Sequence, residues 1–209
     1  MSGHSGVLLR TLYGAGLAIL AASPVRATTI DVTVDTSFLN GLPAVLAFDF
    51  IDGGPPDNTV TLSPLTSDGT QGATSRTGNV AGTGPWTFSD AGGSAFNELL
   101  VPFNPMGTSL SFSFTTTDHP PTGPVPDGLS MFVLDASATS TLIKTNDPTG
   151  ADALFVFGIG QGFAGTTQYE PEQTGFAVTL TPVRPLPEPG SLALALLGTL
   201  TLFARRRNV

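Results

Sequence analysis

Two groups of oxygen-bearing side chains have the composition of a calcium site. Asp52 and Asp57 stand in one Gly- and Pro-rich stretch, and Asn146, Asp147 and Asp152 stand in another. Carboxylate and amide oxygens are the ligands that Ca²⁺ prefers, so either stretch is a candidate Ca²⁺ site, and no other cofactor is indicated. Neither stretch has the spacing of an EF-hand loop, and Asp, Asn and Gly are also common turn residues. Plain turns therefore remain the alternative.

A carbohydrate site is the second chemistry that the sequence offers. Asp127 lies in the stretch PDGLSMFVLD, residues 126–135, which resembles a strand entry of legume-type lectins where such an Asp accepts sugar hydroxyls. Met131 replaces the first aromatic residue of that pattern, and Asp-Gly is also an ordinary turn. Trp86, the single Trp, is the second candidate ligand-binding residue, because an indole ring can stack on a sugar face or fill a core.

Residues suited to catalysis are scarce. His119 is the single histidine between residues 28 and 184, it stands in a Pro-rich loop, and no Gly-x-Ser-x-Gly element supplies a nucleophile. One imidazole without cysteines cannot supply the three or four N or S ligands of zinc. Glu98, Glu170 and Glu172 could hydrolyse a glycoside only if two of them lay about 5 to 10 Å apart across a groove. We therefore expect no enzyme, with glycan hydrolysis as the weakest alternative.

The elements that must position these residues are predicted to be β-strands. Apolar and polar residues alternate with period two, the pattern of half-buried strands, in TTIDVTVD, SLSFSFTT and TGFAVTLT (28–35, 109–116 and 174–181). Longer apolar runs predict central strands buried on both faces at 44–51, 129–136 and 153–160. Turn clusters separate these runs, and no helical period is sustained between residues 28 and 184. The prediction is an all-β domain, an antiparallel β-sandwich of jelly-roll-like kind.

The charge of the chain limits its partners. All 16 acidic residues lie between Asp31 and Glu188, whereas only Arg76, Lys144 and Arg184 of the 8 basic residues lie in that region. Such an acidic surface repels phosphate backbones, so we expect no nucleic-acid partner.

The N-terminal residues 1–27 have the pattern of a secretory signal peptide. Arg10 precedes an apolar run at 12–22, and small residues follow up to a predicted cleavage between Ala27 and Thr28. We therefore expect residues 28–184 to be an exported domain.

The C-terminal residues 185–209, PLPEPGSLALALLGTLTLFARRRNV, predict a short membrane anchor. Pro187, Glu188 and Pro189 precede an uncharged stretch at 191–204, which as a helix is about 21 Å long. This is short for a bilayer core of about 30 Å. However, the basic side chains that follow the helix are long enough to place their charged groups at the membrane–water interface. These are Arg205, Arg206 and Arg207, and they predict a cytoplasmic C-terminus.

The triplet, the apolar helix and the Arg cluster together resemble the PEP-CTERM sorting signal of exopolysaccharide-producing Gram-negative bacteria. The resemblance implies that signal peptidase and the membrane protease-transpeptidase exosortase process the chain. It also implies an inner-membrane-anchored precursor that ends in the cell envelope or outside the cell. An ordinary C-terminal anchor is the alternative.

The domain between the two ends resembles a family of small PEP-CTERM proteins of unknown function, in LAFDFIDGGPPDNTVTLS, FNELLVPF and NDPTGADALFVF. We expect a non-catalytic envelope or matrix protein associated with exopolysaccharide or biofilm. A lectin-like carbohydrate-binding module is the alternative.

Overall fold

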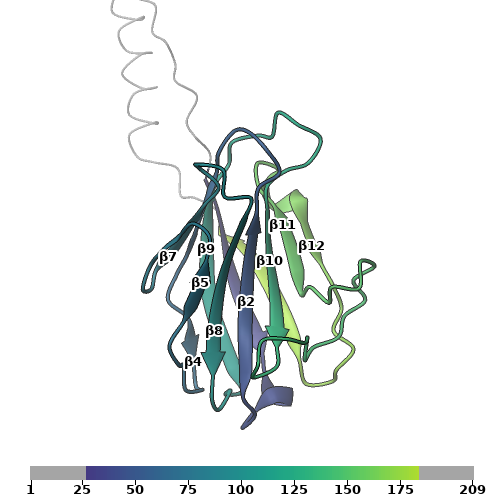
Figure 1. Ribbon diagram of the computed structural model, residues 1–209. Coiled ribbons are helices and arrows are strands. Elements are labelled where there is room, and N and C mark those ends of the chain that lie inside the picture. Colours follow the sequence, from purple (N-terminus) through teal and green to yellow (C-terminus); the bar gives the residue numbers. More distant parts are fainter. Residues whose placement is uncertain (1–26, 184–209) are drawn as a thin grey trace, which may run out of the picture.

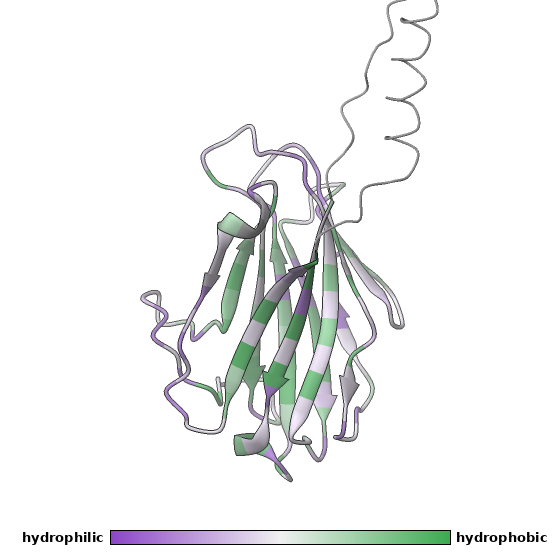
Figure 2. Cartoon of the chain, turned by 180° about the vertical axis from the view of Figure 1, so that it is seen from behind, coloured by the Kyte–Doolittle hydropathy of each residue, from purple (hydrophilic) through white to green (hydrophobic). Residues whose placement is uncertain are grey.

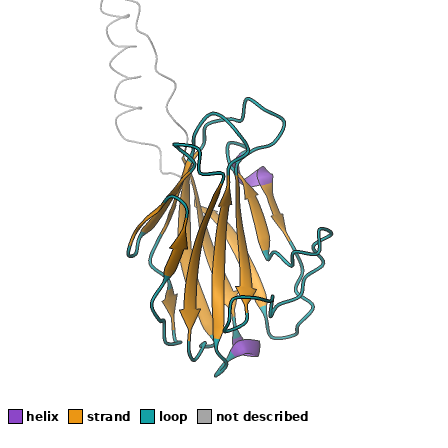
Figure 3. Cartoon of the chain, viewed as in Figure 1, coloured by secondary structure: helices purple, strands orange, loops and turns teal. Residues whose placement is uncertain are grey.

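The computed structural model describes residues 27–183, and this part of the chain is all-β (Figures 1 and 3). Its strands form two sheets in which every pairing is antiparallel. The seven-stranded sheet runs in the order β13 (Ala177–Val183), β1 (Ala27–Asp35), β9 (Ser109–Thr117), β3 (Thr59–Leu62), β7 (Trp86–Ser89) and β6 (Val80–Gly82), with β4 (Thr66–Ser67) also paired to β9. The six-stranded sheet runs in the order β12 (Thr166–Gln168), β11 (Phe155–Gly158), β10 (Gly128–Leu134), β2 (Ala44–Ile51), β8 (Phe96–Phe103) and β5 (Ser75–Thr77). The only helical elements in residues 27–183 are two short 3-10 turns, Ser37–Leu39 and Gly162–Gly165.

The alternation of side chains explains why these segments are strands, and Figure 2 shows it as alternating hydropathy along them. In β1, Ile30, Val32 and Val34 are buried while the residues between them face solvent. β2 is more apolar because Val45 and Ala47, which point away from the inner face, are also buried. The predicted strands at 28–35, 44–51 and 109–116 are confirmed. The predicted strands at 153–160 and 174–181 exist but begin later, as β11 and β13.

One hydrophobic core lies between the inner faces of the two sheets. Phe112 and Phe114 of β9 contact aromatic rings of the opposite sheet. Phe48 meets Phe112 edge-on with 5.3 Å between ring centroids, and Phe155 stacks on Phe114 at 5.9 Å. Such pairs contribute about 0.5–1.5 kcal/mol each beyond their buried area, so they fix the two sheets face to face.

The outer face of the seven-stranded sheet carries mainly hydroxyl side chains. Thr33 of β1 lies between Ser111 of β9 and Thr179 of β13 in the register of the sheet. The hydroxyls of Thr29 and Thr115 lie 2.9 Å apart on the same face. The polar half of the period-two pattern thus forms a continuous Ser- and Thr-rich surface.

The predicted targeting segments lie outside the described residues, apart from the cleavage position. This applies to the signal peptide up to residue 26, to the Pro187, Glu188 and Pro189 triplet, to the helix at 191–204 and to Arg205, Arg206 and Arg207. The predicted cut between Ala27 and Thr28 falls at the first residues of β1. Within the described residues, no helix has the length and apolarity needed to cross a membrane.

Candidate functional site

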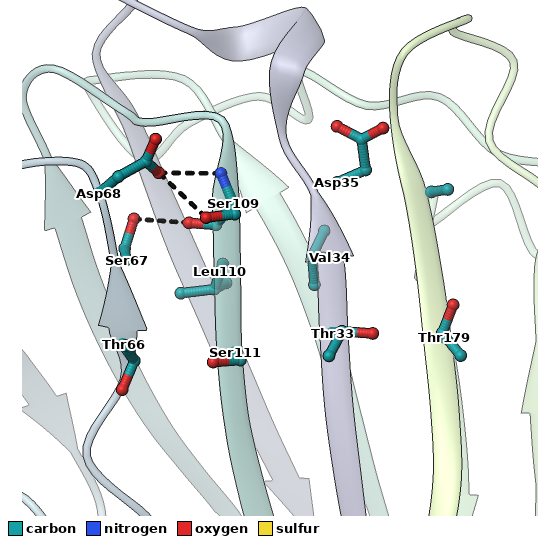
Figure 4. Close-up of a pocket in the computed structure, with 11 residues that line it drawn as sticks. Thr33, Val34, Asp35, Thr66, Ser67, Asp68, Ser109, Leu110, Ser111 and Thr179 are labelled. Carbon is teal, nitrogen blue, oxygen red and sulfur yellow. Dashed lines mark hydrogen bonds between the residues drawn. The ribbon is translucent and has the colours of Figure 1, made fainter.

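A groove on the hydroxyl-rich face is the first candidate site (Figure 4). We call it the outer groove; it consists of a cavity of about 560 Å³ and an overlapping one of about 350 Å³. Thr33, Thr66 and Ser111 line both cavities, so the two form one continuous depression. Strands β1 and β9 form its floor, and β13 and the segment 63–68 flank it.

Two carboxylates stand at one end of the outer groove. Asp68 accepts hydrogen bonds from Thr108 Oγ1 at 2.7 Å and from the Ser109 N–H at 2.9 Å, and these bonds lower its pKa (Figure 4 shows the Ser109 contact). Hydrogen bonds from the side chain and the backbone N–H of Ser37 lower the pKa of Asp35. Both groups are therefore ionised at neutral pH, and their remaining lone pairs can accept hydrogen bonds from a ligand.

A cluster of carboxylates at the other end of the sandwich is the second candidate site. We call Asp52, Asp90 and Asp127 the carboxylate cluster, because each offers a carboxylate oxygen within 4.8 Å of the others. Each residue is the neighbour of a strand end: Asp52 follows β2, Asp90 follows β7, and Asp127 precedes β10. The register pairs Ile51 with Gly128, which explains how Asp52 and Asp127 come together.

Asn58 links the carboxylate cluster across the two sheets. It precedes β3 and lies beside Asp90 because Thr59 pairs with Ser89. Its backbone N–H donates to Asp90 Oδ1 and its Nδ2 donates to Asp127 Oδ2, both at 2.7 Å. The Gly53 N–H donates to Asp127 Oδ1, also at 2.7 Å. Only 3% of the surface of Asp90 and of Asp127 is exposed, so the cluster is an interior site open mainly beside Asp52.

The electrostatics of the carboxylate cluster are unfavourable without a counter-charge. Burial raises the pKa of Asp90 to about 6, and the Asn58 N–H opposes this shift. The charge of Asp127, a proton that the Asp90 carboxyl can share with Asp127, and the charge of Asp52 act in the same direction as burial. Asp90 Oδ2 is buried and has no hydrogen-bond partner among the described residues. A buried carboxylate oxygen without a partner costs free energy, which a bound cation would recover.

Only one of the predicted calcium ligands belongs to the carboxylate cluster, and the others lie in turns. Asp52 belongs to the carboxylate cluster, whereas Asp57 is exposed and not part of it. The other predicted ligands, Asn146, Asp147 and Asp152, form hydrogen bonds within and beside their own turn, and Ca²⁺ binding there stays a prediction. Asp147 accepts from Thr149 and from the Ala153 N–H, and Asp152 pairs with Lys144 at 2.7 Å, while Asn146 Oδ1 accepts the Glu170 N–H.

Both predicted sugar contacts, Asp127 and Trp86, are buried. Trp86 has only 2% of its surface exposed and lies in the core, so its ring cannot stack on a ligand. Asp127 is buried, and both of its oxygens accept hydrogen bonds within the protein, so it is not free at a loop tip. Its place in the carboxylate cluster is the role that the structure gives it.

The residues considered for catalysis lie in different parts of the sandwich. His119 is half-buried, and its Nδ1 lies 2.9 Å from the Asp57 carbonyl. Glu98 lies on β8 opposite Asp49 of β2, whereas Glu170 and Glu172 lie beside the loop at 144–146. The glutamates therefore belong to two different parts of the sandwich.

Sequence reasoning missed Asp90 and the outer groove. Asp90 follows a four-residue strand and precedes a Gly pair, which reads as an ordinary turn. The outer groove consists of residues that alternate with the core positions, and it becomes visible only once β1, β9 and β13 are side by side. Comparison of the chain with protein-family models, with curated proteins and with solved structures finds no match.

Proposed function

We propose that this chain is an exported, non-catalytic protein of the cell envelope or extracellular matrix that binds polysaccharide through the outer groove. We further propose that the sandwich is of jelly-roll-like kind, on the ground that β1, β2 and β3 alternate between the two sheets. The observation that carries the binding proposal is the lining of the outer groove, where hydroxyls and carboxylates stand beside apolar groups such as Val34, Leu110 and Ala177.

The chemistry of that lining suits a polyhydroxylated ligand. The hydroxyls of Thr33, Ser111 and Thr179 can each donate and accept, as sugar hydroxyls do. The carboxylates of Asp35 and Asp68 can only accept hydrogen bonds, so a ligand hydroxyl that contacts them must act as the donor. The backbone N–H and C=O groups of the floor are already paired within the sheet, which disfavours an extended peptide as the ligand.

The charge of the outer groove selects a neutral polysaccharide. Among residues 27–183, its lining includes Asp31, Asp35 and Asp68 and no Lys or Arg. A glycan rich in uronic acids is therefore repelled, while a neutral glycan is not. In the same part of the chain, no aromatic ring other than the buried Phe112 lines the groove, so affinity rests mainly on hydrogen bonds that compete with water. Binding is weak for each site and becomes effective on a repeating polymer.

The sequence of the two ends supports export and sorting. Residues 1–27 have the three parts of a signal peptide, and the Pro-Glu-Pro triplet, apolar helix and arginines resemble the signal that exosortase processes. Signal peptidase and exosortase are thus the proposed partners during export, with transient residence in the inner membrane. The groove residues Asp35 and Ala177 lie at the opposite end of their strands from Thr29 and Val183. A chain held by its C-terminal tail would therefore present the outer groove away from the membrane.

Affinity electrophoresis tests the binding proposal. The full chain is run through gels that contain a neutral β-glucan, an alginate or no polymer, and we expect retardation only by the neutral polymer. Thr33→Trp, which places a bulky ring where the two cavities of the groove meet, should abolish the retardation. Thr181→Trp is the matched control, because Thr181 is exposed on the same face but does not line the groove. Retardation by alginate instead, or an equal loss in both variants, would contradict the proposal.

A further inference from the structure

We propose that the carboxylate cluster of Asp52, Asp90 and Asp127 binds one calcium ion, which joins the two sheets at the end of the sandwich opposite the outer groove. This site is independent of polysaccharide binding. Two observations carry it: the convergence of three carboxylates, and the buried oxygen of Asp90 that has no partner among the described residues.

No protein cation balances the charge of the carboxylate cluster within residues 27–183. That part of the chain has two basic side chains besides His119, and both are engaged elsewhere. Lys144 pairs with Asp152, and Arg76 donates to the carbonyls of Val80 and Gly82. Three carboxylates of which two are buried repel one another at neutral pH, and burying such charges without a partner is costly. A divalent cation removes most of this cost.

The hydrogen bonds of the cluster are arranged to present oxygens to such an ion. Asn58 donates hydrogen bonds to Asp90 and to Asp127. The Gly53 N–H donates to Asp127, and the Gly54 N–H donates to Asp52. These donors fix the rotamers of all three carboxylates and leave Asp90 Oδ2 without a donor. A set of ligands that the protein orients before binding loses little side-chain entropy when the ion enters.

The ligand set favours calcium over zinc and magnesium. It consists of carboxylate oxygens, which are hard ligands, and contains no thiolate or imidazole. Ca²⁺ binds six to eight oxygens at about 2.3–2.6 Å in a flexible geometry, and three carboxylates that lie within 4.8 Å of one another can supply part of this shell. Mg²⁺ requires a near-ideal octahedron and usually keeps several waters, so it suits a site with two buried carboxylates less well. Solvent on the side of Asp52 completes the coordination.

The bound ion has a structural role that follows from the positions of its ligands. Asp52 and Asp127 belong to the six-stranded sheet, and Asp90 follows a strand of the seven-stranded sheet. One ion therefore joins the ends of β2, β7 and β10. Because the ion binds the folded chain only, its effect is a rise in melting temperature of about 5–10 °C at 100 times Kd.

Equilibrium dialysis and thermal melts of the full chain test the site. After removal of divalent ions with EGTA, we expect one Ca²⁺ to bind per chain and the melting temperature to rise with CaCl₂. The rise should exceed that given by MgCl₂ and by NaCl at equal ionic strength, since salt alone screens the acidic surface.

Asp90→Asn separates ion binding from a purely structural role of Asp90. The Asn keeps the acceptor for the Asn58 N–H but removes one charge, so we expect no bound Ca²⁺ and no response to CaCl₂. Its calcium-free melting temperature at pH 8 should equal or exceed that of the wild type, because repulsion within the cluster is relieved. Asp147→Asn, in the other Asp-bearing loop, should keep one bound Ca²⁺. Absence of bound Ca²⁺ in the wild type, equal shifts with CaCl₂ and NaCl, or unchanged Ca²⁺ binding in Asp90→Asn would each overturn the proposal.

Discussion

Asp49 gives a stability prediction that does not depend on any ligand. It points outward from β2, in register with Glu98 of β8 and Ser130 of β10, and its Oδ1 is buried without a partner among the described residues. Burial raises the pKa of Asp49 from 3.8 to about 6, and the charge of Glu98 adds to the shift. The folded protein therefore resists ionisation of this group more than the unfolded chain does.

The magnitude follows from the shift in pKa. A rise of about two units corresponds to about 3 kcal/mol, and solvent at this partly exposed position reduces it to about 1–2 kcal/mol. Because the folded-state pKa lies above the unfolded value, the contribution of Asp49 to stability is fully present below pH 4, where this side chain is protonated in both the folded and the unfolded state. The protein loses this contribution as pH rises through about 6. Asp49→Asn removes the ionisation, and its amide group can donate to the neighbouring Glu98 carboxylate.

Urea unfolding of the full chain in EGTA, from pH 4 to pH 8, measures the effect. We expect Asp49→Asn to be about 1–2 kcal/mol more stable than the wild type at pH 8, and the difference to shrink towards pH 4. Asp31→Asn is the control, because Asp31 is exposed on the outer face of β1 and its replacement should change stability by less than about 0.5 kcal/mol. If the difference in stability between Asp49→Asn and the wild type stayed constant with pH, the ionisation of Asp49 could not be its cause.

Three further predictions concern the loops and the processing of the chain. Gly53→Ala should destabilise the protein by about 1–3 kcal/mol in urea unfolding, because a Cβ at Gly53 would collide with the Pro126 carbonyl beside the carboxylate cluster. Gly123→Ala is the control and should not change the stability, because there is open space around its Cβ position. Mass spectrometry of the exported protein should find Thr28 as its first residue. Glu188→Ala should leave the uncleaved chain in the inner-membrane fraction; release of this variant at the wild-type rate would count against sorting through the triplet.

Alternation of side chains predicts β1 and β9 to within one residue and places the start of β13 three residues too early. Ile30, Val32 and Val34 locate β1 without any knowledge of its neighbours, because a half-buried strand leaves a period of two. The apolar run at 153–160 misleads because Ala153 and Leu154 are buried in the chain that leads into β11, before the strand begins. An apolar run in the sequence indicates a buried segment, and a buried segment is not always a strand.

The candidate sites could be predicted only in part, because both depend on strand register. Asp52 and Asp127 stand out as loop carboxylates, but they converge only because Ile51 pairs with Gly128. Asp90 joins them through Asn58, a contact between two different sheets that no local pattern encodes. Trp86 shows the same limit, since the sequence allows its ring either to stack on a sugar or to fill the core, and the fold decides for the core.

The location of polysaccharide binding tests the central claim most directly. We would record amide chemical shifts of the full chain in detergent during titration with a neutral β-gluco-oligosaccharide. The account predicts that the amides that move are those of the outer groove, around Thr33, Ser111 and Thr179, while those around the carboxylate cluster stay unchanged. Shifts confined to the outer face of the six-stranded sheet, or no shifts at saturating oligosaccharide, would contradict the account.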